Sequence, residues 1–491
     1  MKRQGNEYEV IILGSGLGGL IAGTLLTKNK LSVLFLKENG YQPFYANKGF
    51  WFAPFSNFSE INLKPELFQK VSKALNLPLP IDRQEEGRLA KIDLDRPKPG
   101  ISLQVILPRA RIDLFSQRSL FRMEWRREFP KEFSQIENFY NEMDGIEHLL
   151  KKLREKEGPQ SGFPLRQRSL IKRLLSFDRL PKERVNEKLS SFSGEFKHFI
   201  QLQLISRGNL YSDQIPLSLA AYVLLRGEAD DTIPDLDLEK LEEKVLEQFF
   251  QSGGRVEEIE KVEKVEKGWR KGFTLSLKGG EKVFRSQQLI LNSPLHRISN
   301  LLSKKGKRLS ELGKRIRPRY ILVPLCLGIR EEVVPVGMND LLVSILDLEK
   351  PYEGGNVLFI ALSPKGDETK APEGKRALTV ESLMPLEKWD QTLLMDYQKD
   401  VMRHLEQLFP FLENYIELTD WSWANEQVPR WSYPHFLYET TTDFHWREGV
   451  VPTRISKRFY FIGKENFPYL GLEGEVISGL MVAEQILKKY H

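Results

Sequence analysis

The sequence predicts an α/β fold that combines a discontinuous dinucleotide-binding domain of the Rossmann type with a mixed α+β substrate domain. Three observations support this prediction. A short apolar strand near the N-terminus runs into a glycine-rich loop and an apolar helix. A second apolar strand follows directly, as in the first βαβ unit of such a domain. The chain has 491 residues, more than the roughly 100–200 of one domain, so we expect two domains.

The glycine-rich loop has the spacing G-x-G-x-x-G and follows a predicted strand at residues 9–13. Gly14 permits a tight turn, Gly16 lets the backbone approach a pyrophosphate, and Gly19 lets the next helix pack closely on the sheet. The N–H groups and the positive dipole end of that helix would face the phosphates. The predicted phosphate-binding residues are Gly14, Ser15, Gly16, Leu17, Gly18 and Gly19.

The second predicted strand, residues 33–36, should lead to an acid that binds the adenosine ribose, roughly 20 residues after the glycines. Lys37 stands at that place, and Glu38 follows it. A lysine cannot accept hydrogen bonds from the ribose hydroxyls. Three alternatives remain open. The strand extends by one residue so that Glu38 serves, or Lys37 meets a phosphorylated ribose, or the site has decayed.

Composition excludes several classes of protein. A total of 73 Lys and Arg residues against 67 Asp and Glu residues gives a net charge of +6, a mild excess from which we expect no nucleic-acid partner. The single cysteine, Cys326, excludes an internal disulfide and is expected to be a buried apolar residue. We find no metal-binding spacing and no Gly-x-Ser-x-Gly motif. A signal peptide and any run of about 18 apolar residues are also absent, which predicts a cytoplasmic protein, at most bound to a membrane surface.

The middle of the chain is predicted to form one helix followed by three strands. Apolar residues at helical spacing predict a helix at residues 238–249 that ends at Gly253 and Gly254. Strands are predicted at residues 255–262, 272–277 and 288–291. We interpret Asn292 and Pro294 as a turn that ends the last of these strands.

Four stretches of sequence, in order and across almost the whole chain, resemble the phytoene desaturase, carotenoid isomerase and retinol saturase group of flavoproteins, which are relatives of the amine oxidases. The stretches are the glycine loop Gly14-Ser-Gly-Leu-Gly-Gly-Leu-Ile-Ala22, residues 104–114 with 125–130, residues 362–375 with Ser363-Pro and Asp367 before Ala371-Pro-Glu-Gly-Lys375, and residues 458–479 with Gly471-Leu-Glu-Gly-Glu-Val-Ile-Ser-Gly479.

The resemblance implies bound FAD and a lipophilic polyene or isoprenoid substrate that is desaturated, saturated or isomerised. It assigns further cofactor contacts to Gly463, Lys464, Glu465, Gly471, Leu472 and Glu473, and it assigns no catalytic side chain, because the flavin carries the chemistry. The predicted FAD/NAD(P)-type domain comprises residues 1–75, 230–298 and 450–491. The predicted substrate domain comprises residues 76–229 and 299–449.

Four departures from the family pattern weaken the expected flavin site. Lys37 replaces the ribose-binding acid, and no Gly-Gly-Arg follows the second strand. Residues 232–238 lack the expected glycines, and Lys464 stands where an acid should follow Gly463. The alternative hypothesis is therefore a non-catalytic homologue that acts as a binding or assembly subunit with a protein partner. An amine-oxidase-like flavoenzyme is a weaker alternative.

Two further segments suggest how a lipophilic substrate is handled. Aromatic residues cluster between Trp421 and Trp446, together with His435 and His445, and could line an apolar channel or simply form core. Residues 118–188 are helical in character, amphipathic and rich in Arg and Lys. A solvated basic face is the default interpretation, and docking on an anionic membrane surface is the functional alternative.

Overall fold

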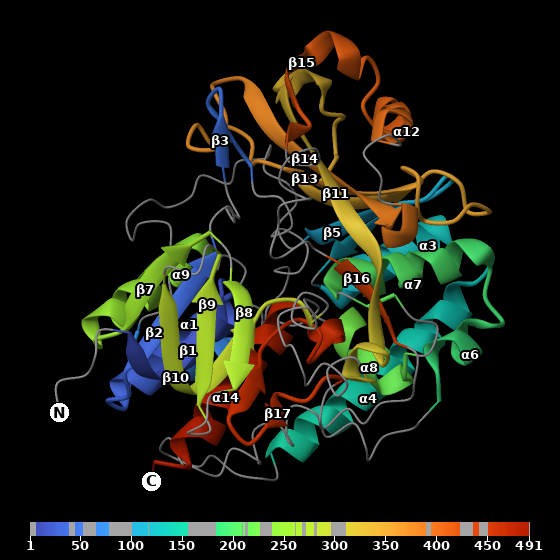
Figure 1. Cartoon of the computed structure of the whole chain (residues 1–491). Helices are drawn as coiled ribbons and strands as arrows, with labels where there is room; N and C mark the ends of the chain where they lie inside the picture. Colours follow the sequence, from blue (N-terminus) through green and yellow to red (C-terminus); the bar gives the residue numbers. More distant parts are fainter. Residues whose placement is uncertain are drawn as a thin grey trace, which may run out of the picture.

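The computed structural model supports a description of most of the chain. The described residues are 6–38, 45–52, 65–77, 101–115, 117–155, 183–208, 210–211, 215–225, 238–260, 262–267, 272–278, 282–295, 311–388, 394–422, 436–440 and 450–490. Two separate large sheets organise these residues (Figure 1).

The first sheet is the predicted Rossmann sheet, with the strand order β17-β18-β10-β1-β2-β7. Strands β18, β10, β1, β2 and β7 run parallel, and β9 and β8 extend the sheet antiparallel from β10. The bounds are β1 Glu7–Gly14, β2 Val33–Glu38, β7 Arg255–Ile259, β8 Val262–Lys267, β9 Phe273–Leu277, β10 Val283–Asn292, β17 Arg454–Ser456 and β18 Phe459–Phe461. The predicted α/β class is confirmed.

Burial on both faces explains the sequence of this sheet. In β1 the run from Val10 to Leu13 is fully buried, as is typical of parallel strands covered by helices. Helix α1 (Leu17–Lys28) is buried from Leu17 to Thr27 because it lies between the sheet and the helices α9 (Leu238–Gln251) and α14 (Leu472–Leu487). An all-round apolar helix is what such a position requires.

The predicted central helix is confirmed as α9, which buries Leu241, Val245 and Phe249 and ends before Gly253. Gly253 has a φ of 91°, a conformation that favours glycine after a helix. The single strand predicted for residues 255–262 is wrong. The chain leaves the sheet after Ile259 and begins the separate strand β8 at Val262, which pairs with β9 rather than with β2.

The second sheet is mainly antiparallel, with the order β15-β11-β14-β13-β12-β5-β6, and β16 pairs with β11. Its bounds are β5 Ile101–Ile106, β6 Arg111–Phe115, β11 Ile316–Arg330, β12 Leu341–Ile345, β13 Val357–Leu362, β14 Lys375–Pro385, β15 Ile416–Asp420 and β16 Phe436–Thr440. Figure 1 shows the long strand β11 descending from this sheet to β16. Cys326 is fully buried in β11, as predicted.

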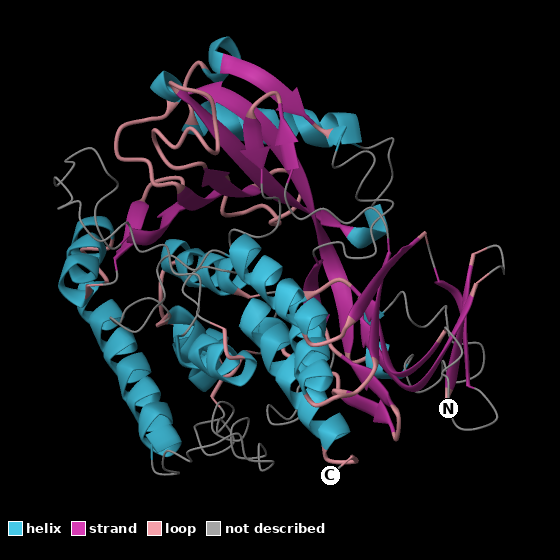
Figure 2. Cartoon of the chain, turned by 90° about the vertical axis from the view of Figure 1, so that its left-hand side faces the viewer, coloured by secondary structure: helices cyan, strands magenta, loops and turns pink. Residues whose placement is uncertain are grey.

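Helices accompany the second sheet, as Figure 2 shows. They are α3 Arg118–Glu128, α4 Phe133–Glu155, α6 Val185–Leu189, α7 Gly194–Arg207, α8 Leu217–Leu224 and α12 Leu394–Leu408. Helix α2 (Pro65–Leu75) instead contacts α1 beside the first sheet. Aromatic rings fill the space between α3, α4 and α7; the rings of Trp125 and Tyr140 stack with their centroids 4.3 Å apart. No helix in the described part of the chain is long and apolar enough to cross a membrane.

A small hairpin connects the two halves of the molecule. Strands β3 (Tyr45–Asn47) and β4 (Phe50–Phe52) follow the Rossmann unit in sequence but pack on the second sheet. Phe50 lies so close to Gly328 of β11 that a Cβ there would be 2.5 Å from the ring. Asn47 donates to Asp420 of β15 at 2.7 Å. The chain therefore crosses to the second sheet in this hairpin, lies beside α1 again in α2, and enters the second sheet once more at β5.

Candidate dinucleotide-binding site

The candidate site lies where the carboxyl ends of β1 and β10 meet. These strands are parallel neighbours, and Gly14 at the end of β1 is paired with Asn292 at the end of β10. Helix α1 begins at Leu17, directly after the loop, and α14 packs against it. Ligands of open parallel sheets bind outside the carboxyl ends of the strands. The predicted glycine loop therefore occupies the expected edge of the sheet.

The loop turns sharply into the helix. Gly14 has a φ of 144°, which L side chains rarely adopt. Gly16 is the N-cap residue of α1, and Gly18 and Gly19 belong to the first turn. The first N–H groups of a helix have no acceptor within it. They are thus available to a ligand or to a side chain from elsewhere in the chain.

Two side chains from distant parts of the sequence accept these N–H groups. Gly18 donates its N–H to Glu475 Oε1 at 3.2 Å, and Gly19 donates to Asn292 Oδ1 at 3.2 Å. Asn292 Nδ2 donates in turn to the same Glu475 oxygen at 3.2 Å and to the Ile462 carbonyl at 3.1 Å. This buried network joins α1, α14 and the ends of β10 and β18.

The space beside Gly16 shows how the site relates to a cofactor. A Cβ on Gly16 would lie 1.9 Å from Glu475 Oε1 and 2.8 Å from Asn292 Oδ1. The second glycine of the motif is where the backbone approaches a pyrophosphate. Ser15 Oγ is buried without a hydrogen-bond partner among the described residues, as expected of a hydroxyl that faces a ligand. The loop therefore has the backbone shape and donors that a pyrophosphate requires, and one of these donors, the N–H of Gly18, is accepted by Glu475.

The second strand is longer than predicted. Pairing with β7 continues through Lys37 opposite Glu258 and Glu38 opposite Ile259, so β2 ends on Glu38 instead of at Lys37. Lys37 is half-buried. Glu38 thus stands at the end of the strand, where a ribose-binding acid is expected.

Two of the residues after β18 that are predicted to contact the cofactor, Gly463 and Glu465, make hydrogen bonds within the chain. Gly463 donates its N–H to Asn466 Oδ1 at 2.9 Å, and Lys464 is half-buried. Glu465 is buried and accepts the N–H of Leu295 at 2.9 Å and a hydrogen bond from Tyr438. Burial raises the pKa of Glu465, assisted by the nearby charge of Glu475 and opposed by these hydrogen bonds. The acid displaced by one residue thus connects β18 to the end of β10 and to β16.

The start of α14 contains the remaining predicted residues. Gly471 has a φ of 56° and is the N-cap residue, Leu472 begins the helix, and Glu473 is buried. Tyr222 of α8 donates to Glu473 Oε2 at 3.1 Å. Burial also raises the pKa of Tyr469, which precedes the helix. Helix α8 therefore contacts the predicted cofactor segment through a buried polar pair.

The predicted aromatic wall is described only in part. Phe436 and Tyr438 are buried in β16, and Trp421 is half-buried. The other members lie outside the described residues, namely Trp423, Trp431, Tyr433, His435, Phe444, His445 and Trp446. A channel lined by this segment remains a prediction.

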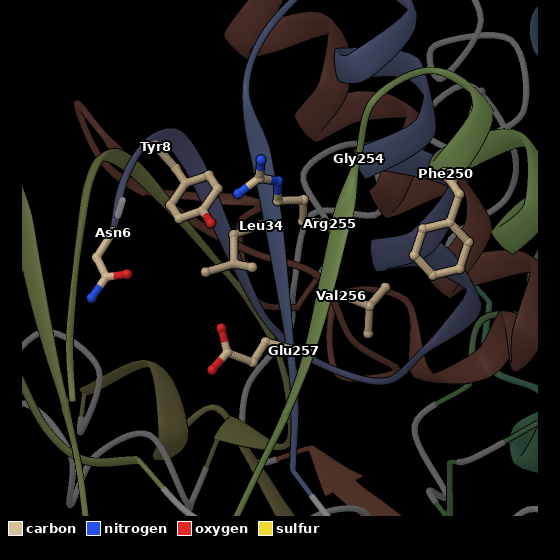
Figure 3. A pocket seen from close by; sticks show the side chains of 8 residues that line it. All are labelled: Asn6, Tyr8, Leu34, Phe250, Gly254, Arg255, Val256 and Glu257. Carbon is tan, nitrogen blue, oxygen red and sulfur yellow. The ribbon is translucent and has the colours of Figure 1, made fainter. Parts of the chain in front are cut away.

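One surface depression lies away from the candidate site. Its volume is about 310 Å³, and its lining includes Tyr8, Leu34, Arg255 and Glu257 (Figure 3). These residues come from the amino ends of β1, β2 and β7. It is therefore at the opposite edge of the sheet from the glycine loop. Among the described residues, no group of three or more His, Cys, Asp or Glu side chains could hold a metal ion.

Sequence-based prediction missed two residues of this region, Glu475 and Tyr222, and it placed Tyr438 in the aromatic wall without its contact with Glu465. An acid in the first turn of a helix is common, so only the contact with Gly18 distinguishes Glu475. Tyr222 and Tyr438 come from α8 and β16, and nothing local in their sequence indicates that they meet acids near α14 and β18. Asn292 was predicted as part of a turn, and it also binds the glycine loop.

The sequence is 22% identical to the chloroplastic prolycopene isomerase of Daucus carota, over 98% of this chain and 80% of that protein. It is also 22% identical to the chloroplastic prolycopene isomerase of Arabidopsis thaliana, over 99% of this chain and 84% of that protein. The predicted resemblance to the carotenoid isomerase group is confirmed. No family model matches the sequence.

Solved structures confirm the fold. A putrescine oxidase variant superimposes with a TM-score of 0.61 at 15% identity, covering 98% of this chain and 99% of that one. An oxidoreductase from Methanosarcina mazei has a TM-score of 0.57 at 13% identity, with 97% and 100% covered. Cyclohexylamine oxidase from Brevibacterium oxydans has a TM-score of 0.56 at 14% identity, with 98% and 99% covered. The chain thus shares its fold with these proteins over almost its whole length.

Proposed function

We propose that this chain is an FAD-dependent oxidoreductase that isomerises, desaturates or saturates a lipophilic polyene of the isoprenoid type. The observation that supports the proposal best is the similarity to two prolycopene isomerases along 98% and 99% of the chain. A glycine loop with an unpartnered buried hydroxyl at Ser15 supports the cofactor. The amine-oxidase-type fold is compatible with this function but does not select the substrate.

Specific residues of the chain would hold FAD. The loop from Gly14 to Gly19 would bind the pyrophosphate through backbone N–H groups. Glu38, or Lys37 if the ribose is phosphorylated, would bind the adenosine part. Residues 463–465 and 471–473 would surround the remainder. When bound, the flavin supplies the electron sink and source for C–H bonds next to a polyene.

The contribution of the chain's own side chains is to exclude water and hold geometry. Tyr222, Tyr438 and Tyr469 are all buried next to the cofactor segments. Their hydroxyl groups lie close to the carboxylates of Glu465 and Glu473 or to one another. Such pairs fix the start of α14 against α8 and β16 without access for bulk water. A dry site is what a lipophilic substrate requires.

An absorbance spectrum tests the cofactor. The protein is incubated with excess FAD and desalted, and the spectrum is recorded between roughly 300 and 550 nm. Flavin bands near one per chain support the proposal, and an anaerobic incubation with a poly-cis polyene, analysed by chromatography, then tests isomerisation. Loss of all flavin from a folded chain would contradict the proposal.

A second candidate function is a non-catalytic binding or assembly subunit. The carboxylate of Glu475 against the glycine loop favours it, because a chain that fills this place itself has less need of a cofactor. This candidate predicts a colourless, folded protein that co-purifies with a stable partner. The spectrum described above separates the two candidates.

We also propose contact with an anionic membrane surface through α3, which would give the substrate a short path. Met123 is 65% exposed there, beside Arg122 and Arg126. Much of the basic charge nearby is already paired within the protein. Described pairs are Arg118 with Asp144, Arg122 with Glu137, Arg127 with Glu124 and Glu128, and Lys188 with Glu142. The contact would therefore depend on Met123 as well as on charge.

A further inference from the structure

We propose that Glu475 is an internal substitute for the dinucleotide pyrophosphate, and that FAD binds this chain only when the Glu475 carboxylate leaves the glycine loop. The inference deepens the proposed function and rests on it, because it concerns the same site. It accounts for two observations together: the backbone has the form of a dinucleotide-binding site, and one of the chain's own side chains closes that site.

The first argument is position. Glu475 Oε1 accepts the N–H of Gly18, which lies in the first turn of α1. The same oxygen lies 1.9 Å from the place of a Cβ on Gly16. These are the helix end and the glycine that a pyrophosphate approaches. A phosphate oxygen and the carboxylate therefore require the same donors and the same space.

The second argument is charge. The N-terminus of a helix attracts one anion through its dipole and its free N–H groups. Glu475 is buried, and Glu465 is buried close enough for the two charges to act on each other. A pyrophosphate added beside Glu475 would bring further negative charge to a poorly solvated site. Coexistence is disfavoured, so the carboxylate must move or be removed.

The third argument is that Glu475 is held in place by a specific network. Asn292 Nδ2 donates to Glu475 Oε1 at 3.2 Å while Asn292 Oδ1 accepts the N–H of Gly19. An ordinary helix cap is a residue adjacent to the helix. Here the cap comes from a residue 457 positions away in sequence. Without FAD, the chain can thus keep Glu475 against the glycine loop and provide acceptors for the N–H groups at the start of α1.

The experiment is an FAD titration of the full-length chain, measured by calorimetry and by quenching of flavin fluorescence. Glu475→Ala removes the carboxylate, and Glu475→Gln removes the charge but keeps an acceptor. Glu484→Ala is the matched control, because Glu484 lies on the same helix and pairs with Lys488 at its far end. Thermal unfolding without FAD provides a readout independent of activity.

We expect Glu475→Ala to bind FAD about tenfold more tightly than the unaltered chain, with Glu475→Gln in between and Glu484→Ala unchanged. Without FAD, Glu475→Ala should unfold at a lower temperature, because Gly18 loses its acceptor. Folding of Glu475→Gln keeps the test valid if Glu475→Ala does not fold.

The possible failures are distinguishable. Equal FAD affinity in the unaltered chain and in both Glu475 variants would overturn the inference while the proposed flavoprotein function stands. No FAD binding by any folded variant would overturn the proposed function together with the inference. Weaker binding by Glu475→Ala would show that Glu475 contacts the cofactor instead of replacing part of it.

Discussion

Gly18 of α1 and Gly479 of α14 lie in close contact in the candidate site. A Cβ on Gly479 would lie 2.2 Å from the carbonyl oxygen of Gly18. Since that oxygen belongs to a helix backbone, it cannot rotate away from an added Cβ. This contact sets the distance between the helices, and so places Glu475, one turn before Gly479, against the glycine loop.

Gly479→Ala should therefore force the helices apart. Overpacking a core costs about 1–3 kcal/mol, and we expect the upper end of that range in the free energy of unfolding, measured with urea. Gly145→Ala in α4 is the control, because nothing lies within 4 Å of its added Cβ. That change should stabilise by about 0.5–1 kcal/mol. Similar effects of the two substitutions would refute the close packing.

Asn292 gives a second prediction, because its amide both accepts and donates at the glycine loop. In Asn292→Asp, an acceptor would replace the Nδ2 donor opposite the Ile462 carbonyl and Glu475 Oε1. An unsatisfied buried group costs about 1–3 kcal/mol, and two adjacent carboxylates add repulsion. We expect Asn292→Asp to destabilise the chain at pH 7 more than Asn292→Ala does. Chemical denaturation checks this, and the opposite order would mean that Nδ2 is not a donor.

The Rossmann unit could be predicted from the sequence because its signals are local. The strand ending at Gly14, the three glycines and the apolar helix are contiguous in the sequence. Each glycine is required at its position for one steric reason. The central helix and its end before Gly253 could be predicted for the same reason, because their signals are also local. The end of β2 could not be predicted, because pairing with β7, more than 200 residues later in the sequence, extends the strand to Glu38.

The interior of the site could not be predicted because its contacts join distant segments. Glu475 reaches Gly18, Tyr222 reaches Glu473, and Glu465 reaches Leu295. None of these pairs has a sequence spacing that indicates contact. Lys464 and Glu465 illustrate the limit well. The one-residue displacement of the acid was read as a departure from the flavin pattern, and the structure shows what the displaced acid does instead.

The membrane proposal predicts binding that depends on both salt and Met123. The chain should co-sediment with vesicles containing phosphatidylserine, and binding should weaken as salt rises because surface charges are screened. Met123→Asp should reduce binding further, since it removes an exposed apolar side chain and adds a negative charge. Val336→Asp is the control, as Val336 is fully exposed on a loop outside α3. Equal loss in both variants, or none, would exclude α3 as the contact.

His404 makes the stability of the chain depend on pH. It lies on α12 and is buried against β12, where Nδ1 lies 2.8 Å from the Gly355 carbonyl and Nε2 lies 2.9 Å from Ser344 Oγ. A carbonyl only accepts, so Nδ1 carries the proton, and neutral Nε2 accepts from the serine. Burial lowers the pKa of His404 to about 4, and the Gly355 bond opposes this only in part.

The unfolded chain, in which a histidine has a pKa near 6.5, therefore binds more protons than the folded chain between pH 6.5 and 4. The stability due to neutral His404 is complete above pH 6.5 and is lost as the pH falls through this window. Linkage gives a loss of about 2 kcal/mol between pH 7 and pH 5. His404→Gln should be less stable at pH 7 but should lack this part of the slope. Urea unfolding of both chains at the two pH values measures the difference, and parallel slopes would show that the pKa of His404 is the same in the folded and the unfolded chain.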